Sequence, residues 1–127
     1  MSNWQGKSKR KATSSRLKKR SKKRKFEIGN PPTETIIGDK KKKVIRGRSG
    51  IKKVRLKKID EANVTDPQTG KTEKTKILKL IENPANVDYT RRRILTKGAI
   101  VETELGKARI TSRINQNGIV NAILLYE

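Results

Sequence analysis

The chain has 127 residues and carries 34 Lys and Arg against 12 Asp and Glu, a net charge of +22. Hydrophobic residues make up 31% of the chain and aromatic residues 3%, so we expect one small domain with a small core. Cys and His are both absent, which removes disulfides, thiolate chemistry, the commonest general base and the commonest metal ligands. We therefore expect no enzyme, no metal site, no cofactor and no small-molecule substrate.

Membrane insertion and secretion are not supported either. No segment approaches the about 20 apolar residues that a membrane span needs. The N-terminus is basic, but no apolar stretch follows it as in a signal peptide. The composition predicts a cytoplasmic protein with no membrane partner.

The positive charge is concentrated in the first half of the chain. Residues 1–58 hold 23 basic and 3 acidic groups, a net of +20, whereas residues 59–127 hold 11 and 9, a net of +2. Charge of one sign opposes folding by self-repulsion unless a polyanion neutralises it. The first half is therefore expected to bind a polyanion, and the second half has the composition of an ordinary domain.

Residues 1–25 contain 12 basic residues and no acid, with too few apolar groups to fold alone. Such a run is either a solvated tail or sorting signal, or an arm that contacts phosphates; fully extended it would reach about 80 Å. Asn30-Pro31-Pro32 forces extended geometry, which predicts a boundary near residue 32. The candidate RNA-binding bases of the arm are Lys7, Lys9, Arg10, Lys11, Arg16, Lys18, Lys19, Arg20, Lys22, Lys23, Arg24 and Lys25.

Trp4 is the sole tryptophan and lies among basic residues and Gly. An aromatic ring in such surroundings can stack on a nucleobase or sugar. Packing of the ring against another protein or against its own domain is an equal alternative, and the sequence leaves both open.

Residues 33–59 predict three strands and a loop. Residues 33–37 form a first strand, Val44 begins a second, and in residues 51–59 Val54 and Leu56 alternate with basic residues. The loop Arg46-Gly47-Arg48-Ser49-Gly50 can either cradle a phosphate or form a plain hairpin turn. The candidate RNA-binding bases of this region are Lys41, Lys42, Lys43, Arg46, Arg48, Lys52, Lys53 and Arg55.

Residues 62–82 predict a second hairpin. Asp66-Pro67-Gln68-Thr69-Gly70 is a strong turn signal between residues 62–65 and the run 71–82. The apolar density of residues 77–81 predicts burial on both faces of that strand. Asn83-Pro84-Ala85-Asn86 ends it.

Two further clusters of charged residues lie in the second half of the chain, one of three arginines and one of two glutamates. Arg91, Arg92 and Arg93 lie on a segment expected to be extended; at least one should face a partner, although a surface loop balanced by Asp88 and Glu102 is an alternative. Glu102 and Glu104, two residues apart on a strand, resemble a paired-carboxylate site. They are better explained as offsetting nearby bases of the same domain than as catalytic groups.

Residues 94–125 are the expected core. Ala108, Ile110, Ser112 and Ile114 alternate with polar and basic residues, and Gly98 and Gly106 bracket a preceding strand. Asn115-Gln116-Asn117-Gly118 predicts a turn that returns the chain as a hairpin over residues 119–125. The many β-branched residues favour strands over helices.

These elements predict an all-β protein: a small antiparallel β-barrel or sandwich of about six strands, residues 33–127, preceded by an extended basic arm, residues 1–32.

Three separated motifs resemble the S8e family of small-subunit ribosomal proteins, in its archaeal form. They are RKATSSRLKKRSKKRKFEIG, VIRGRSGIKKVRL, and KGAIVETELGKARITSR with the NG turn that follows. The family pattern has two glycines where this chain has Ser14-Ser15. The resemblance implies a compact antiparallel β domain in the body of the small subunit, with a basic N-terminal extension threaded into ribosomal RNA.

The leading hypothesis is a structural protein of the small ribosomal subunit that binds ribosomal RNA by charge neutralisation and shape, with neighbouring ribosomal proteins as further partners and no homo-oligomer. An assembly factor built on the same domain is the main alternative. A DNA-compacting basic protein is a third hypothesis, and an enzyme is the least supported.

Overall fold

The structure is a computed structural model that describes residues 4–18 and 22–126, except for the side chain of Arg48. The chain divides into two compact units, Met1–Pro32 and Thr33–Glu127. Each unit is described by itself.

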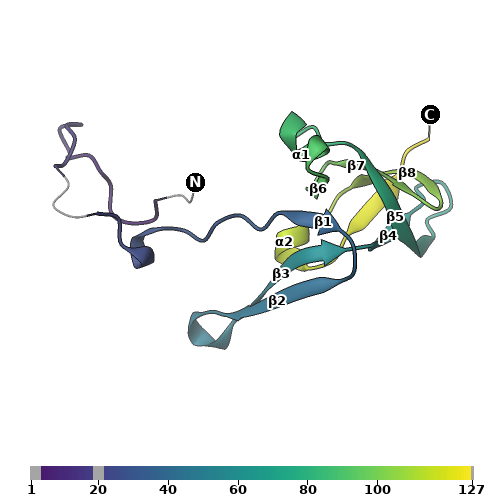
Figure 1. Ribbon diagram of the computed structural model, residues 1–127, viewed down its shortest axis with the longest axis horizontal. Coiled ribbons are helices and arrows are strands. Elements are labelled where there is room, and N and C mark those ends of the chain that lie inside the picture. Colours follow the sequence, from purple (N-terminus) through teal and green to yellow (C-terminus); the bar gives the residue numbers. More distant parts are fainter. Residues whose placement is uncertain (1–3, 19–21, 127) are drawn as a thin grey trace. The chain divides into compact units, whose positions relative to one another are not determined.

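The unit Thr33–Glu127 is built from strands, which confirms the prediction of an all-β fold (Figure 1). Its described part has nine strands against about six expected; the two-residue strand β6 is too short to show a periodic pattern, whereas β1 lies within the first strand predicted over residues 33–37. Two short α-helices interrupt the strands, α1 (Val87–Arg91) and α2 (Ile114–Asn117). The strands are β1 (Thr35–Ile37), β2 (Lys41–Arg46), β3 (Lys52–Ile59), β4 (Glu61–Thr65), β5 (Thr72–Glu82), β6 (Ile94–Leu95), β7 (Ile100–Thr103), β8 (Gly106–Ile110) and β9 (Asn121–Leu124).

Five strands close a barrel in the order β4-β5-β7-β8-β9. All neighbouring pairs are antiparallel except β4 and β9, which pair in parallel with Val64 opposite Ala122. The predicted antiparallel barrel is therefore confirmed at every neighbouring pair except this seam. A closed ring of five strands cannot alternate in direction at every step, so at least one pair must be parallel.

The interior of the barrel holds the core that the sequence pattern predicted. Ala108 and Ile110 are buried, whereas Lys107 and Arg109 on the same strand are exposed. This alternation confirms a strand with one face to solvent. The buried apolar cluster consists of Leu56, Ile59, Ala62, Val64, Ile77, Leu95, Ala99, Val101, Ala108, Ile110, Ile114, Val120 and Ala122.

The predicted hairpin of residues 107–125 is present, but its connection is a helical turn. β8 pairs with β9 and ends at Ile110, and α2 occupies the position of the expected turn. The Ser112 hydroxyl accepts a hydrogen bond from the Asn121 backbone N–H at 2.9 Å and donates to the Ile119 carbonyl at 3.0 Å. These bonds close the loop around α2, which ends at Gly118 with φ +68°.

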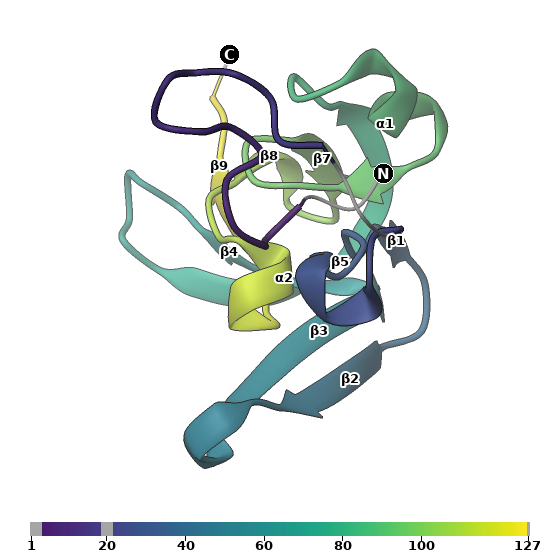
Figure 2. The same ribbon diagram turned by 90° about the vertical axis from the view of Figure 1, so that its left-hand side faces the viewer.

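A second sheet has the order β2-β3-β1-β6. β3 joins it to the barrel, because only Asp60 separates β3 from β4. β1 pairs with β6 in antiparallel on one side and, on the other, in parallel with Lys58 and Ile59 at the end of β3. Beyond that point β2 and β3 form a two-stranded ribbon that projects from the barrel (Figures 1 and 2), and residues 41–58 are called the β2–β3 ribbon below.

The prediction that residues 77–81 are buried on both faces is wrong. Ile77 is 4% exposed, but Leu78 is 58% exposed and Ile81 37%. β5 is a barrel strand, so only one of its faces points into the core.

The described residues contain no helix of the length and apolar character that a membrane crossing requires.

Replacement of Gly118 by Ala tests how tightly α2 packs against β3. A Cβ at Gly118 would lie 2.7 Å from Val54 Cγ1, whereas Gly70, with φ +70° against +68°, has no neighbouring atom within 4 Å. Both substitutions strain the backbone, but only Gly118→Ala creates a steric overlap, which we expect to cost about 1 to 3 kcal/mol more. Urea unfolding followed by circular dichroism measures the difference.

The variant Val54→Ala supplies the control for this comparison. Because it removes the overlapping methyl groups, it should make Gly118→Ala less costly than in the parent chain. Equal losses of stability for Gly118→Ala and Gly70→Ala would contradict the close packing.

Candidate nucleic-acid interface

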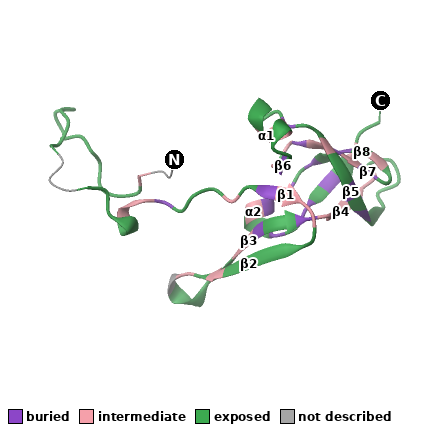
Figure 3. Cartoon of the chain, viewed as in Figure 1, coloured by how far each residue is buried: buried purple, intermediate pink, exposed green. Residues whose placement is uncertain are grey.

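The β2–β3 ribbon carries cations directly opposite one another. Residues 40–59 include eleven Lys and Arg and no Asp or Glu. Like charges in directly opposed positions destabilise a strand pair. Nearly all of β2 is exposed (Figure 3), so its cations gain little from burial or from neighbouring acids. The directly opposed basic pairs are Lys41 and Lys58, Lys43 and Arg55, and Arg46 and Lys52.

The ribbon displays bases on the side opposite its anchoring apolar residues, as the sequence predicted. Leu56 is fully buried and Val54 half-buried, whereas Lys53 and Lys57 are exposed and Arg55 is half-buried. Leu56 and Ile59 are both buried although they are three residues apart, a spacing that strict alternation does not give. The register of the partner strand shifts at the same place, between Lys41 and Lys42. This shift is a bulge, which breaks the simple alternation of the sequence.

The tip of the ribbon is a hairpin turn. The backbone N–H of Gly47 donates to the Ile51 carbonyl at 2.6 Å, so it is not available to a phosphate. Ser49 and Gly50 have φ of +59° and +73° in the one-turn 3-10 helix η2 (Arg48–Gly50). Of the two interpretations of this loop, the geometry favours the turn.

The three consecutive arginines are not on an extended segment. Arg91 ends α1 and Arg93 has φ +54°. The helix forms here because the Asn86 side chain accepts a hydrogen bond from the Asp88 N–H at 2.9 Å, a standard N-terminal cap. The prediction of an extended segment was wrong because it did not take the helix cap at Asn86 into account.

Arg92 is engaged within the chain. Its guanidinium forks onto the Glu34 carboxylate and lies 3.8 Å from that of Asp88. Among the described residues no ion pair involves Arg91 or Arg93. The alternative interpretation was a surface segment whose arginines are balanced by Asp88 and Glu102, and it is correct for Asp88. Glu102 instead forms an ion pair with Lys79 at 2.8 Å.

The basic N-terminal segment has local turns but almost no buried side chains. The Lys11 N–H donates to the Ser15 carbonyl at 2.9 Å and the Leu17 N–H to the Lys9 carbonyl at 2.8 Å. Ser14 adopts φ +63° at the position where the S8e pattern has Gly, and the Arg10 guanidinium donates to its carbonyl at 2.8 Å. The positive-φ turn is therefore present without glycine.

Trp4 organises the first loop of this segment. Its indole Nε1 donates to the Lys7 carbonyl at 2.8 Å, and the Lys9 ammonium lies 5.0 Å from the ring centroid, within cation–π range. The Gln5 N–H donates to the Glu27 carbonyl at 2.9 Å, beside the 3-10 helix η1 (Lys25–Glu27). The ring thus has contacts within its own unit.

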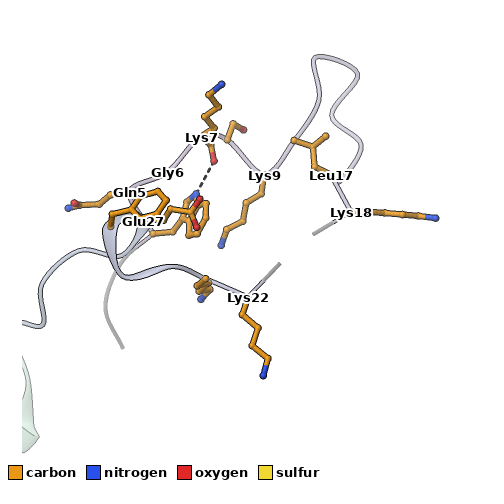
Figure 4. A pocket seen from close by; sticks show the side chains of 12 residues that line it. Gln5, Gly6, Lys7, Lys9, Leu17, Lys18, Lys22 and Glu27 are labelled. Carbon is orange, nitrogen blue, oxygen red and sulfur yellow. Dashed lines mark hydrogen bonds between the residues drawn. The ribbon is translucent and has the colours of Figure 1, made fainter. Parts of the chain in front are cut away.

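An open hollow of about 490 Å³ lies next to Trp4. Lys9, Lys18 and Lys22 surround it (Figure 4), together with the apolar side chains of Leu17 and Phe26. Cations around an apolar floor are the features that bind a nucleobase with its phosphate.

Two acids of the β unit, Glu61 and Asp66, have lowered pKa values because of partners inside the unit. Glu61 lies 2.6 Å from the Lys74 ammonium and 3.7 Å from that of Lys40, and the hydrogen bond from Lys74 lowers the pKa of Glu61. The Tyr126 hydroxyl donates to Asp66 and lowers its pKa to about 2, with help from the Thr69 hydroxyl at 2.7 Å. No ion pair of the described residues joins an acid to one of the directly opposed bases of the β2–β3 ribbon.

Comparison with known proteins identifies the family. The model of the family described as ribosomal protein S8e matches residues 4–125. The chain belongs to the ribosomal protein S8e family. A protein of Methanocella arvoryzae named small ribosomal subunit protein eS8 is 54% identical over 122 residues, 96% of this chain and 98% of that protein. The protein of the same name from Sulfolobus acidocaldarius is 49% identical over 128 residues, covering all of both chains.

The S8e match extends over both units, so the basic segment and the β unit belong to the same family pattern. A protein of Methanocorpusculum labreanum with the same name is 52% identical over 122 residues. Membership of a family of ribosomal proteins agrees with the expectation of a structural protein and gives no support to an enzyme.

The structure brings the candidate bases of residues 41–55 together on the β2–β3 ribbon, whereas Arg91 is the last residue of α1 and Arg92 and Arg93 follow it. Lys19 and Arg20 lie outside the described residues, as does the side chain of Arg48. Sequence reasoning did not include Lys57 and Lys58 among the candidates. The strand register is the signal that adds Lys58, since it lies opposite Lys41.

The Tyr126 to Asp66 hydrogen bond predicts an acid-dependent contribution to stability. Because the folded pKa of Asp66 is lowered to about 2, the ionised carboxylate stabilises the fold above its unfolded pKa of about 3.9, and this contribution is lost as pH falls toward 2. Tyr126→Phe should raise the pKa of Asp66 toward its ordinary value, as measured by NMR titration of the carboxyl carbon. Thr69→Val, which removes a weaker hydrogen bond, should raise it less. An Asp66 that still titrates near 2 in Tyr126→Phe would contradict the assignment.

Proposed function

We propose that this chain is a structural constituent of the small ribosomal subunit in the cytoplasm and that it binds ribosomal RNA through its basic segment and its β2–β3 ribbon. The observation that carries the proposal is the run of eleven bases without an acid, folded so that cations face one another across two strands. The phosphate backbone of RNA is the polyanion that relieves this repulsion. The relatives named small ribosomal subunit protein eS8 support a place in the small subunit.

Charge neutralisation is the main mechanism of binding. Arg forks onto two phosphate oxygens, whereas Lys acts as a mobile point charge, and neither requires a particular base. A-form RNA hides its base edges in a deep and narrow groove, so a basic protein recognises mainly its shape and backbone. The closed barrel provides the rigid support from which the ribbon bases project.

The proposed roles of the two parts follow their structures. Residues 1–32 act as an RNA-binding extension and residues 33–127 as the β domain that fixes their orientation. In the extension, Trp4 holds the loop that carries Lys7 and Lys9, and the hollow beside it accepts an unstacked base. Neighbouring ribosomal proteins are further partners, and the chain acts as a single copy.

A transient assembly factor remains the second candidate, because it would use the same basic surfaces. The relatives that align along 98 to 100% of their length all bear the name of a subunit protein, which favours the permanent role. Quantitative mass spectrometry of salt-washed small subunits tests this choice. One copy per mature subunit is expected, and absence from mature subunits would support the assembly factor.

Removal of residues 1–32 tests the division of labour. The truncated chain should keep its β circular dichroism but bind a small-subunit ribosomal RNA fragment more weakly and with less salt dependence. If half of the 12 bases of the arm contact phosphates, the log–log salt slope should fall by about 4 to 5. Filter binding over a salt series measures both quantities.

Three results would contradict parts of the proposal. A full-chain salt slope equivalent to one or two phosphates would show that charge neutralisation is not the mechanism. An affinity for duplex DNA equal to that for structured RNA under direct competition would favour a DNA-compacting protein. Loss of the β signal on truncation would show that the boundary at residue 32 is misplaced.

A further inference from the structure

The β2–β3 ribbon carries bases on both of its faces, not on one. In an antiparallel pair, directly opposed residues project to the same side and successive residues alternate. Pairing of Lys43 with Arg55 and of Ile45 with Lys53 places these residues on one side, the Lys43 face. Pairing of Lys42 with Leu56, Val44 with Val54 and Arg46 with Lys52 defines the opposite side, the Lys42 face. These five pairs therefore place three cations on each face, and Lys57 adds a fourth to the Lys43 face by alternation along β3.

The structure leaves both faces open to a partner. The exposed cations of the Lys42 face are Lys42, Arg46 and Lys52. On the Lys43 face, Lys43 and Lys53 are exposed and Arg55 is half-buried. The apolar residues of the Lys42 face are covered, since Leu56 is buried in the core and Val54 lies against Gly118 of the α2 turn, but its three cations are exposed.

These six cations have no acidic partner in the described part of the chain. The ion pairs of that part use Lys40, Lys74, Lys79 and Arg92, none of which is among the six. Each of these Lys and Arg side chains can contact a partner only on its own face, because the ribbon backbone lies between the two faces. Each face therefore needs its own source of negative charge.

One RNA duplex cannot readily serve both faces. A two-stranded ribbon fits the about 12 Å major groove of B-DNA, where it meets phosphates on either side. The corresponding groove of A-form RNA is too deep and narrow for side chains to read, and its minor groove is a wide, shallow surface that offers phosphates to one face. Two faces of cations on a projecting ribbon thus match two RNA segments, one on each side.

We propose that the β2–β3 ribbon is a wedge that binds two separate RNA segments at once, one through the Lys43 face and one through the Lys42 face. This inference rests on the proposed function and specifies how the ribbon performs it. The ribbon then bridges RNA segments rather than lying on a single helix. Its net effect is to hold two phosphate backbones together that would otherwise repel each other.

The test measures bridging with the full chain and two short RNA hairpins, one carrying a donor dye and the other an acceptor. Energy transfer reports RNAs held by the same protein, and anisotropy with one RNA reports simple binding. The two matched variants are K43Q/K53Q/R55Q and K42Q/R46Q/K52Q, each of which removes three charges from one face. The variant with all six substitutions gives the background due to the N-terminal segment and to the remaining ribbon bases, Lys41, Arg48, Lys57 and Lys58.

Either three-residue variant should reduce energy transfer to the level of the six-residue variant. Each should still bind a single RNA more tightly than the six-residue variant, with a salt slope lower than that of the parent by about 2 to 3. The charge-matched control K71Q/K76Q/K97Q, on the barrel, should retain bridging. These Gln substitutions replace half-buried or exposed cations that repel one another, and circular dichroism should confirm that the variants stay folded.

Other outcomes separate this inference from the function on which it rests. If one variant keeps the bridging of the parent, or if each keeps half of it, the two-faced wedge is wrong although the ribbon still binds RNA. If the six-residue variant binds and bridges RNA as the parent does, these six cations have no role in RNA binding, and the part of the proposed function that assigns it to them fails as well.

Discussion

Repulsion between opposed cations is the constraint on which the structure of the β2–β3 ribbon depends. Cross-strand neighbours normally stabilise a sheet, but three of the six registered pairs in this ribbon are like-charged. Only backbone hydrogen bonds and a few apolar contacts oppose that repulsion in the isolated chain. When a polyanion binds, the same pairs contribute to binding instead of destabilising the ribbon. The fold and the function of the ribbon are therefore linked through its partner.

The barrel makes such a ribbon possible. β3, which carries many of the charged residues, continues through Asp60 into β4. β4 is one of the strands of the closed barrel. Leu56 and Ile59 anchor it in the core, and α2 packs on Val54 through the one glycine that leaves room for it. Apolar packing where the ribbon joins the barrel thereby supports the charged residues further along the ribbon. This arrangement is expected of a rigid scaffold that presents phosphate-binding groups.

Local patterns predicted much of this structure, and long-range pairing was beyond them. The alternation around Ala108, the turn at Asp66 and the basic stripe of residues 51–59 follow from periodicity and turn chemistry, which are properties of neighbouring residues. The parallel seam of the barrel and the second basic face depend on which strands pair and in what register, which no local pattern specifies. Leu78 was misplaced because an apolar run does not show which side faces the core, and α1 was missed because five residues give little periodicity.

Amide hydrogen exchange of the β2–β3 ribbon, with and without a small-subunit ribosomal RNA fragment, tests the central claim most directly. In the free chain, the amides of Val44 and Val54 should exchange much faster than those of barrel residues such as Val101. RNA should slow the ribbon amides about tenfold or more and leave the barrel amides nearly unchanged, since a ligand stabilises the region that it binds. Ribbon amides that are as protected as the barrel in the free chain, or that do not respond to RNA, would contradict the account.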